Sequence, residues 1–245
     1  MEIETVCILG KEESDTKLVE FLAKADMKVF VAEIDKDFDK RVVQANLILE
    51  VGLEDIELKT KVAKKWDVEC HQKAMLATVT ANPWVTQIAA ATSRPEMVAG
   101  LHLTKNPLEE KYLVQIVSGL QTSQETMQSL EDMMKRAGLT VVRVEENPGL
   151  ILDRIIASIV NEAALMYSTK LATLRDIDRM MRSCVNWPMG PFEFADIIGI
   201  DKVVDTLESM SEQLGPKYMP CFLLQKMVSA GWLGKKTGRG FYVYN

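Results

Sequence analysis

The hydrophobic pattern of this chain changes once along its length, near Asn147, and this change limits the folds open to it. Before Asn147, short apolar runs of strand length alternate with segments of helical periodicity. From Asn147 to Pro220, apolar residues recur at helical spacing, without the alternation typical of strands. A chain of 245 residues can bury two modest cores. We therefore predict two domains, residues 1–146 and 147–245.

The first domain opens with a strand, a helix and a second strand, and further short apolar runs follow at regular intervals. The runs that we interpret as strands are 4–9, 28–32, 46–51, 75–80, 98–103, 113–118 and 140–144. This alternation is typical of an α/β fold, so we predict a Rossmann-like, doubly wound parallel sheet. For the second domain we predict only helices. Asn147 is the expected cap of the first of them and Thr173 the expected entry to the next.

Composition and charge narrow the classes of partner. The formal net charge is −6, which argues against nucleic acid and anionic membranes as partners. No apolar run approaches the ~20 residues of a membrane helix. The 4 cysteines and 2 histidines are scattered, so neither a metal site nor a disulfide framework is expected. We expect a cytoplasmic protein that binds small molecules or other proteins.

Four segments after residue 146 follow one another in a recognisable order. They are NPG with the later DRI and NEA, then DID, then PMGPFEFADIIGID, then GWLGKKTGRGFY. This order resembles the carboxy-terminal domain of 3-hydroxyacyl-CoA dehydrogenases, including the 3-hydroxybutyryl-CoA type. The resemblance implies NAD as cofactor, an acyl-CoA as ligand and a homodimer formed through the helical domain.

The turn after the first strand would hold the diphosphate of NAD, and it keeps only the first glycine of the family's motif. This chain has Gly10, followed by Glu12, Asp15 and Lys17 at the later glycine positions. Side-chain bulk and negative charge there oppose a doubly negative diphosphate, so we expect NAD binding to be lost or strongly weakened. The alternative is that these acids serve the amino end of a helix, with Ser14 or Asp15 as its cap.

Glu33 is the second candidate for a cofactor-binding residue, besides Gly10. It follows the second strand, where such folds place the acid that accepts the ribose hydroxyls. The alternative is an ordinary solvated glutamate. Between Ile34 and Ala45 the chain is shorter than the resemblance implies, which we interpret as an internal deletion that could remove one strand.

Oxidation of a secondary alcohol needs a general base, a carboxylate that orients it, and donors for the charge that develops on oxygen. The resemblance places His102 at the catalytic histidine and Asn106 in the turn that follows it. It places Gln115 at the position of the orienting glutamate, and Asp153 at an asparagine that contacts substrate. Ala81 stands where the family has a serine, so that hydroxyl is missing. The segment HLTKNP is also one residue longer than the family's HFFNP.

Two of these positions have alternative interpretations. Asp153 could reach His102 and replace the missing carboxylate, or it could serve only the first turn of its helix. His102 could act in catalysis, or it could be hydrogen-bonded to a turn.

Three functions follow from these residues. The first is a 3-hydroxyacyl-CoA dehydrogenase-like protein whose NAD-dependent turnover is impaired or lost. The second is an active 3-hydroxybutyryl-CoA dehydrogenase that tolerates an unusual cofactor turn. The third is a non-catalytic binding or assembly module that dimerises through the helical domain.

Overall fold

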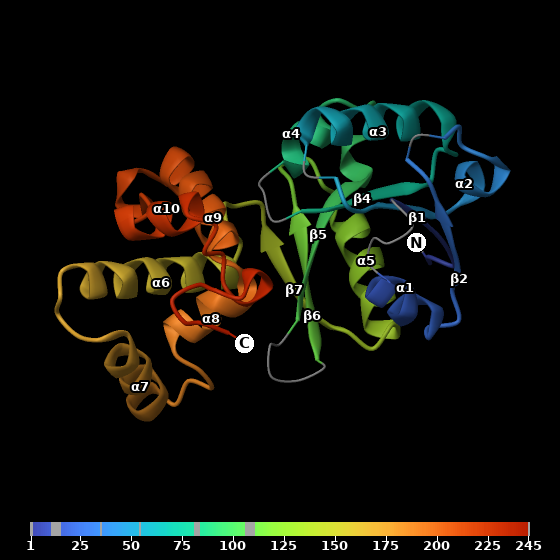
Figure 1. The fold of residues 1–245 in the computed structure, drawn as a ribbon. Helices are drawn as coiled ribbons and strands as arrows, with labels where there is room; N and C mark the ends of the chain where they lie inside the picture. The colour runs from blue at the N-terminus through green and yellow to red at the C-terminus, as the bar shows by residue number, and fades with distance from the viewer. Residues whose placement is uncertain are drawn as a thin grey trace. The chain divides into compact units, whose positions relative to one another are not determined.

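The computed structural model describes residues 2–10, 16–34, 36–53, 55–80, 84–105 and 111–244. Backbone contacts divide the chain into two compact units, Met1–Glu146 and Asn147–Asn245. Both are drawn in Figure 1. No helix of the described residues is both long and apolar enough to cross a lipid bilayer.

The first unit is built on a sheet of seven strands in the order β2-β1-β3-β4-β5-β6-β7. The strands are β1 Thr5–Leu9, β2 Lys28–Ala32, β3 Leu47–Glu50, β4 Met75–Val79, β5 Val98–Lys105, β6 Tyr112–Ser118 and β7 Thr140–Glu145. This confirms the Rossmann-like α/β class. The predicted parallel sheet is parallel except at one pair, because β6 runs antiparallel to β5. Only residues 106–111 join these two strands, and a parallel pair needs a crossover of a dozen residues or more.

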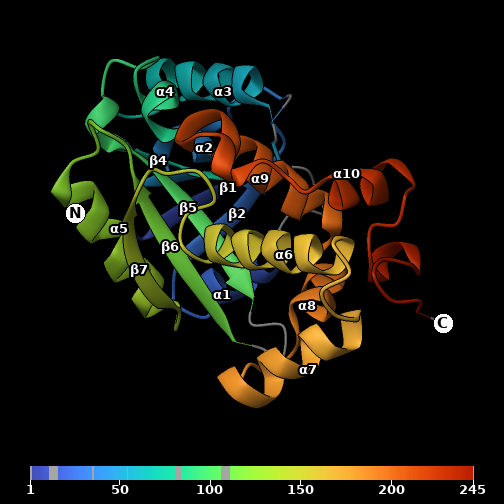
Figure 2. The same cartoon turned by 90° about the vertical axis from the view of Figure 1, so that its left-hand side faces the viewer.

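Helices cover both faces of this sheet. They are α1 Thr16–Ala23, α2 Lys40–Gln44, α3 Ile56–Glu69, α4 Val85–Ala89 and α5 Gln124–Arg136, and the short 3-10 helix η1 spans Pro95–Met97. One buried core joins the sheet to α1 and α5, and a second core joins its other face to α2, α3 and α4 (Figures 1 and 2). The inner strands β1, β3 and β4 are therefore buried on both sides, which explains their nearly continuous apolar sequences.

The second unit contains helices and no strand in the part that the structure describes, as its pattern predicts. The helices are α6 Leu152–Ser168, α7 Leu174–Val185, α8 Pro191–Ile198, α9 Ile200–Leu214 and α10 Phe222–Ser229, with 3-10 turns η2 Pro216–Tyr218 and η3 Lys235–Thr237. The Thr173 side chain accepts a hydrogen bond from the backbone N–H of Asp176, which confirms it as the cap of α7.

Asn147 does not cap α6, so that prediction was wrong. The helix begins at Leu152, after Gly149 and Leu150 have both adopted positive φ values of 71° and 48°. The Asn147 carboxamide oxygen instead accepts a hydrogen bond from Arg154 Nη1 at 3.1 Å. A hydrogen bond from the Leu150 N–H to the Asn147 carbonyl at 3.1 Å closes this turn, and the helix begins after it.

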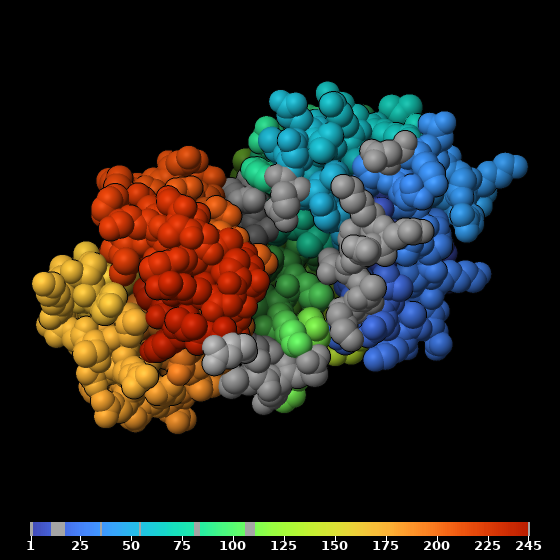
Figure 3. All heavy atoms as spheres, in the orientation of Figure 1, coloured from blue at the N-terminus to red at the C-terminus, as the bar shows by residue number. Residues whose placement is uncertain are grey.

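Two buried carboxylates, those of Asp196 and Asp178, bind the carboxy-terminal segment of this unit, which is red in Figure 3. Asp196 accepts hydrogen bonds from the backbone N–H groups of Phe241 and Tyr242 and from the hydroxyl of Tyr244, each at 2.9 Å. Asp178 accepts the Tyr242 hydroxyl at 2.7 Å. Burial raises the pKa of the Asp178 carboxyl, and burial together with the Asp178 charge raises the pKa of Tyr242.

Candidate active site

The first part of the site is the switch point of the sheet, where the chain passes from β1 outward to β2 and then back to β3 on the other side. Parallel α/β sheets bind their ligands at such points, outside the carboxyl ends of the strands. Gly10 directly follows β1 here, and its N–H donates to the Ala32 carbonyl of β2 at 3.1 Å. This hydrogen bond holds the ends of the two strands together.

Glu33 follows β2 at the same edge of the sheet. Its carboxylate accepts a hydrogen bond from Lys36 Nζ at 2.6 Å, and 47% of its side chain is exposed. A glycine after β1 and an accessible acid after β2 fit the ribose side of a dinucleotide. Glu12 and Asp15 lie outside the described residues, so the expected repulsion of the diphosphate stays a prediction.

A buried ion pair lies at the carboxyl ends of β3 and β4. Lys59 of α3 donates its three ammonium hydrogens to Glu50 Oε2, Thr78 Oγ1 and the Val79 carbonyl, at 2.6, 2.9 and 2.9 Å. Thr78 donates its own hydroxyl to Glu50 Oε2 at 2.6 Å. The Lys59 charge thus neutralises Glu50, which would otherwise place an unpaired carboxylate beside the switch point.

We did not predict this ion pair from the sequence, although the position of Lys59 indicates it. Lys59 stands on the apolar stripe of α3, three residues after Ile56 and seven before Trp66. Both Lys59 and Trp66 are buried. A lysine at a core position of a helix is rare unless it is paired, so its position predicts a buried carboxylate partner.

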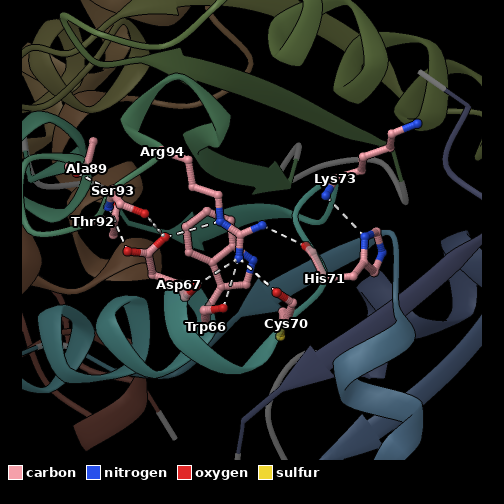
Figure 4. Close-up of polar contacts among 9 residues, drawn as sticks. All are labelled: Trp66, Asp67, Cys70, His71, Lys73, Ala89, Thr92, Ser93 and Arg94. Carbon is pink, nitrogen blue, oxygen red and sulfur yellow. Dashed lines mark hydrogen bonds and ion pairs between the residues drawn. The ribbon is translucent and has the colours of Figure 1, made fainter.

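Arg94 supports the segment that leads into β5 (Figure 4). Its guanidinium lies 4.1 Å from the centre of the Trp66 ring, and its Nη atoms donate to the backbone carbonyls of Trp66, Asp67, Cys70 and His71. A cation that satisfies the last carbonyls of a helix also stabilises its dipole. Arg94 therefore holds the carboxyl end of α3, and we assign this cluster a structural role.

His102 and Gln115 form the second part of the site. They are directly opposite each other in the antiparallel register of β5 and β6. Their strand neighbours Leu101 and Ile116 enter the core that contains α1 and α5, so His102 and Gln115 lie on the other face of the sheet. Only 2% of Gln115 is exposed, whereas His102 is half-buried. The sheet thus brings a polar, uncharged amide beside the imidazole.

The remaining predicted site residues belong to other parts of the chain. Asn106 and Ala81 lie outside the described residues. Asp153 stands in the first turn of α6, in the second unit, where its charge favours the helix dipole. Its action on His102 stays a prediction. Among the described residues, no group of three or more His, Cys, Asp or Glu side chains is arranged to hold a metal ion.

Known proteins resemble both units. The sequence matches the family models "3-hydroxyacyl-CoA dehydrogenase, NAD binding domain" over residues 10–147 and "3-hydroxyacyl-CoA dehydrogenase, C-terminal domain" over residues 149–244. A probable 3-hydroxybutyryl-CoA dehydrogenase of Bacillus subtilis is 39% identical over 201 residues, covering 82% of this chain and 70% of the relative. A 3-hydroxybutyryl-CoA dehydrogenase of Clostridioides difficile is 38% identical, covering 82% of this chain and 71% of the relative. The crystal structure of (S)-3-hydroxybutyryl-CoA dehydrogenase from Ralstonia eutropha is similar over 100% of both chains, with 28% identity and a TM-score of 0.87.

Proposed function

Because the chain belongs to the 3-hydroxyacyl-CoA dehydrogenase family, we propose that it interconverts a short 3-hydroxyacyl-CoA and the corresponding 3-oxoacyl-CoA, with NAD as the hydride carrier. The observation that carries this proposal is the half-buried His102 on β5, next to the buried Gln115. The names of the bacterial relatives support the short-chain substrate class.

His102 is the group that moves the proton. During oxidation its imidazole would accept the proton of the 3-hydroxyl, and during reduction it would return the proton to the oxygen, with a bound nicotinamide as the source or acceptor of the hydride. Gln115 can orient the ring by a hydrogen bond but supplies no charge to stabilise the imidazolium. We therefore expect a turnover slower than that of a histidine–carboxylate pair.

The cofactor would be held by Gly10 and Glu33. Gly10 leaves room for the backbone to approach a diphosphate, and Glu33 can accept the ribose hydroxyls. The nicotinamide, when bound, supplies the hydride acceptor. We expect weak binding, because Glu12 and Asp15 add negative charge to the turn that follows Gly10.

A second candidate function is binding without turnover. The neutral Gln115 and the missing hydroxyl at Ala81 favour it, because both remove groups that the reaction uses. In this case the chain retains an acyl-CoA ligand, or pairs with other proteins through its helical unit.

An absorbance assay with NADH and acetoacetyl-CoA separates these two functions, with His102→Gln as control. The proposed dehydrogenase consumes NADH only when both substrates are present, and His102→Gln lowers this rate by about 100-fold or more. A wild-type rate equal to that of His102→Gln contradicts the proposal. Calorimetric binding of acetoacetyl-CoA without NADH consumption would support the second candidate.

We further propose a homodimer that forms through the second unit. α6 and α7 border a groove lined almost entirely by apolar side chains, among them Ile159, Met166, Ile177 and Met180. Met180 is 59% exposed and Leu171, which precedes α7, is 71% exposed. Apolar surface of this kind is typical of a protein interface.

A further inference from the structure

The Thr104 hydroxyl is a buried polar group without a partner in the part of the chain that the structure describes. Thr104 belongs to β5, two residues after His102, and its Oγ1 is buried from solvent and has no hydrogen bond to any residue that the structure describes. Buried hydroxyls are normally paired, because an unpaired one costs free energy. The most direct explanation of such a hydroxyl is a ligand that forms the missing hydrogen bond with it.

Strand geometry sets the direction of this hydroxyl. Leu101 and Leu103 pack with the core that contains α1 and α5, and successive side chains of a strand point to opposite faces. Thr104 therefore shares the other face with His102. On β6 the residue opposite Thr104 is Leu113, which offers no polar side-chain atom.

We propose that Thr104 contacts the substrate and that its hydroxyl donates a hydrogen bond to an oxygen of the acyl thioester on which His102 acts. This inference rests on the proposed function. A 3-hydroxyacyl or 3-oxoacyl thioester carries one oxygen on its first carbon and one on its third. Residues i and i+2 of a strand lie about 6.5–7 Å apart on one face, so His102 can reach one oxygen and Thr104 the other.

The Thr104 hydroxyl also compensates for a hydroxyl that this chain lacks at Ala81. Ala81 provides no hydroxyl where the family resemblance implies a serine. A donor on β5 supplies a substrate hydrogen bond from a different position, to the thioester oxygen, while His102 acts on the oxygen of the third carbon.

The alternative is that threonine stands here only as a good strand former, and valine tests this. Valine has the same branched shape and favours strands as well, but lacks the hydroxyl. If the hydroxyl forms a hydrogen bond only with a ligand, Thr104→Val leaves the melting temperature of the free protein unchanged or raises it. If the hydroxyl has a protein partner, Thr104→Val lowers the melting temperature.

The matched control is Thr126 of α5, a buried threonine with partners. Its Oγ1 donates to the Glu96 carbonyl at 2.8 Å and accepts from Ser123 Oγ at 3.0 Å. Thr126→Val should lower the melting temperature by several degrees, roughly 2–8 °C, and leave the affinity for acetoacetyl-CoA unchanged.

Calorimetric titration with acetoacetyl-CoA gives the decisive comparison. We expect Thr104→Val to weaken binding about 5- to 30-fold, and Thr104→Ser to stay within about threefold of the wild type. Equal affinities of the wild type and Thr104→Val would overturn the inference. So would a wild type that does not bind acetoacetyl-CoA, or a Thr104→Val melting temperature as low as that of Thr126→Val. Failure of the proposed function is distinguishable, because NADH consumption can be absent while Thr104-dependent binding persists.

Discussion

Gln115 is the residue that we expect to have the largest effect on the proposed chemistry of His102. It is buried and directly opposite His102, and its amide carries no charge. A carboxylate at the same position would stabilise the imidazolium that forms when His102 accepts a proton. We therefore expect the side chain at position 115 to set how well His102 works as a base.

Gln115→Glu should restore the missing charge and raise kcat for acetoacetyl-CoA reduction by about tenfold or more. Steady-state assays measure this, with Gln121→Glu, an exposed turn position, as control. An unchanged or lower kcat in a Gln115→Glu protein that is still folded would show that His102 does not depend on this neighbour.

Lys59 is the other single residue whose substitution we expect to have a large effect, in this case on the free energy of unfolding. Only 1% of its side chain and 2% of that of Glu50 are exposed. Lys59→Met leaves a buried carboxylate unpaired, so we expect the free energy of unfolding to fall by about 3–5 kcal/mol in urea denaturation. The partly exposed pair of Lys135 and Glu131, with 58% and 17% of their side chains exposed, is the control, and Lys135→Met should cost less than about 1 kcal/mol. Similar losses for the two variants would show that burial does not matter for the Lys59 pair.

Among the secondary-structure elements, the carboxy-terminal segment depends mainly on Asp196, which accepts three of its hydrogen bonds. Asp196 is fully buried, and it satisfies two backbone N–H groups that otherwise lose their partners. Asp196 Oδ1 would also lie only 1.9 Å from a Cβ added at Gly240, which explains why a glycine is needed there. The segment is therefore fitted closely around the carboxylate.

Asp196→Ala should release residues 238–244 and lower the free energy of unfolding by roughly 3–5 kcal/mol. Urea denaturation and limited proteolysis of the carboxyl terminus measure the two effects. Asp201→Asn is the control, because it removes only the partly exposed pair with Lys236. Early cleavage in both variants, or in neither, would contradict this assignment.

The elements also show what sequence reasoning can and cannot predict. Periodicity located all seven strands of the described residues, because each contains a short apolar run, and the inner strands are buried on both faces. It missed the antiparallel direction of β6, which depends on a connection too short for a crossover and not on the strand itself. It missed the start of α6, because two left-handed residues follow Asn147, and one of them is a leucine. The proximity of His102 and Gln115 depends on strand register, which is a tertiary property.

In the molecule as a whole, the candidate site and the apolar groove belong to different units. The first contains the Gly10 and Glu33 edge together with His102, and the second contains the apolar groove of α6 and α7. The family models match the units separately, one to each. We therefore predict that a substitution in the groove changes the oligomeric state of the protein without changing the activity of the first unit.

Met180→Glu places a charge in the groove and should convert a dimer into a monomer of 27.5 kDa. Light scattering with the wild type should give twice this mass, and Lys202→Glu, an exposed change on α9, should leave it unchanged. A wild type that is already monomeric would contradict the dimer, as would a Met180→Glu protein that stays dimeric.

The proposed function depends on transfer of a hydride from NADH to the substrate, and isotopic labelling follows this transfer itself. The wild type is mixed with acetoacetyl-CoA and NADH deuterated at the transferable position, and the product is analysed by mass spectrometry. The account predicts 3-hydroxybutyryl-CoA with one deuterium on its third carbon, formed by the wild type and at a strongly reduced rate by His102→Gln. Absence of labelled product with the wild type, or equal labelling by both proteins, would contradict it.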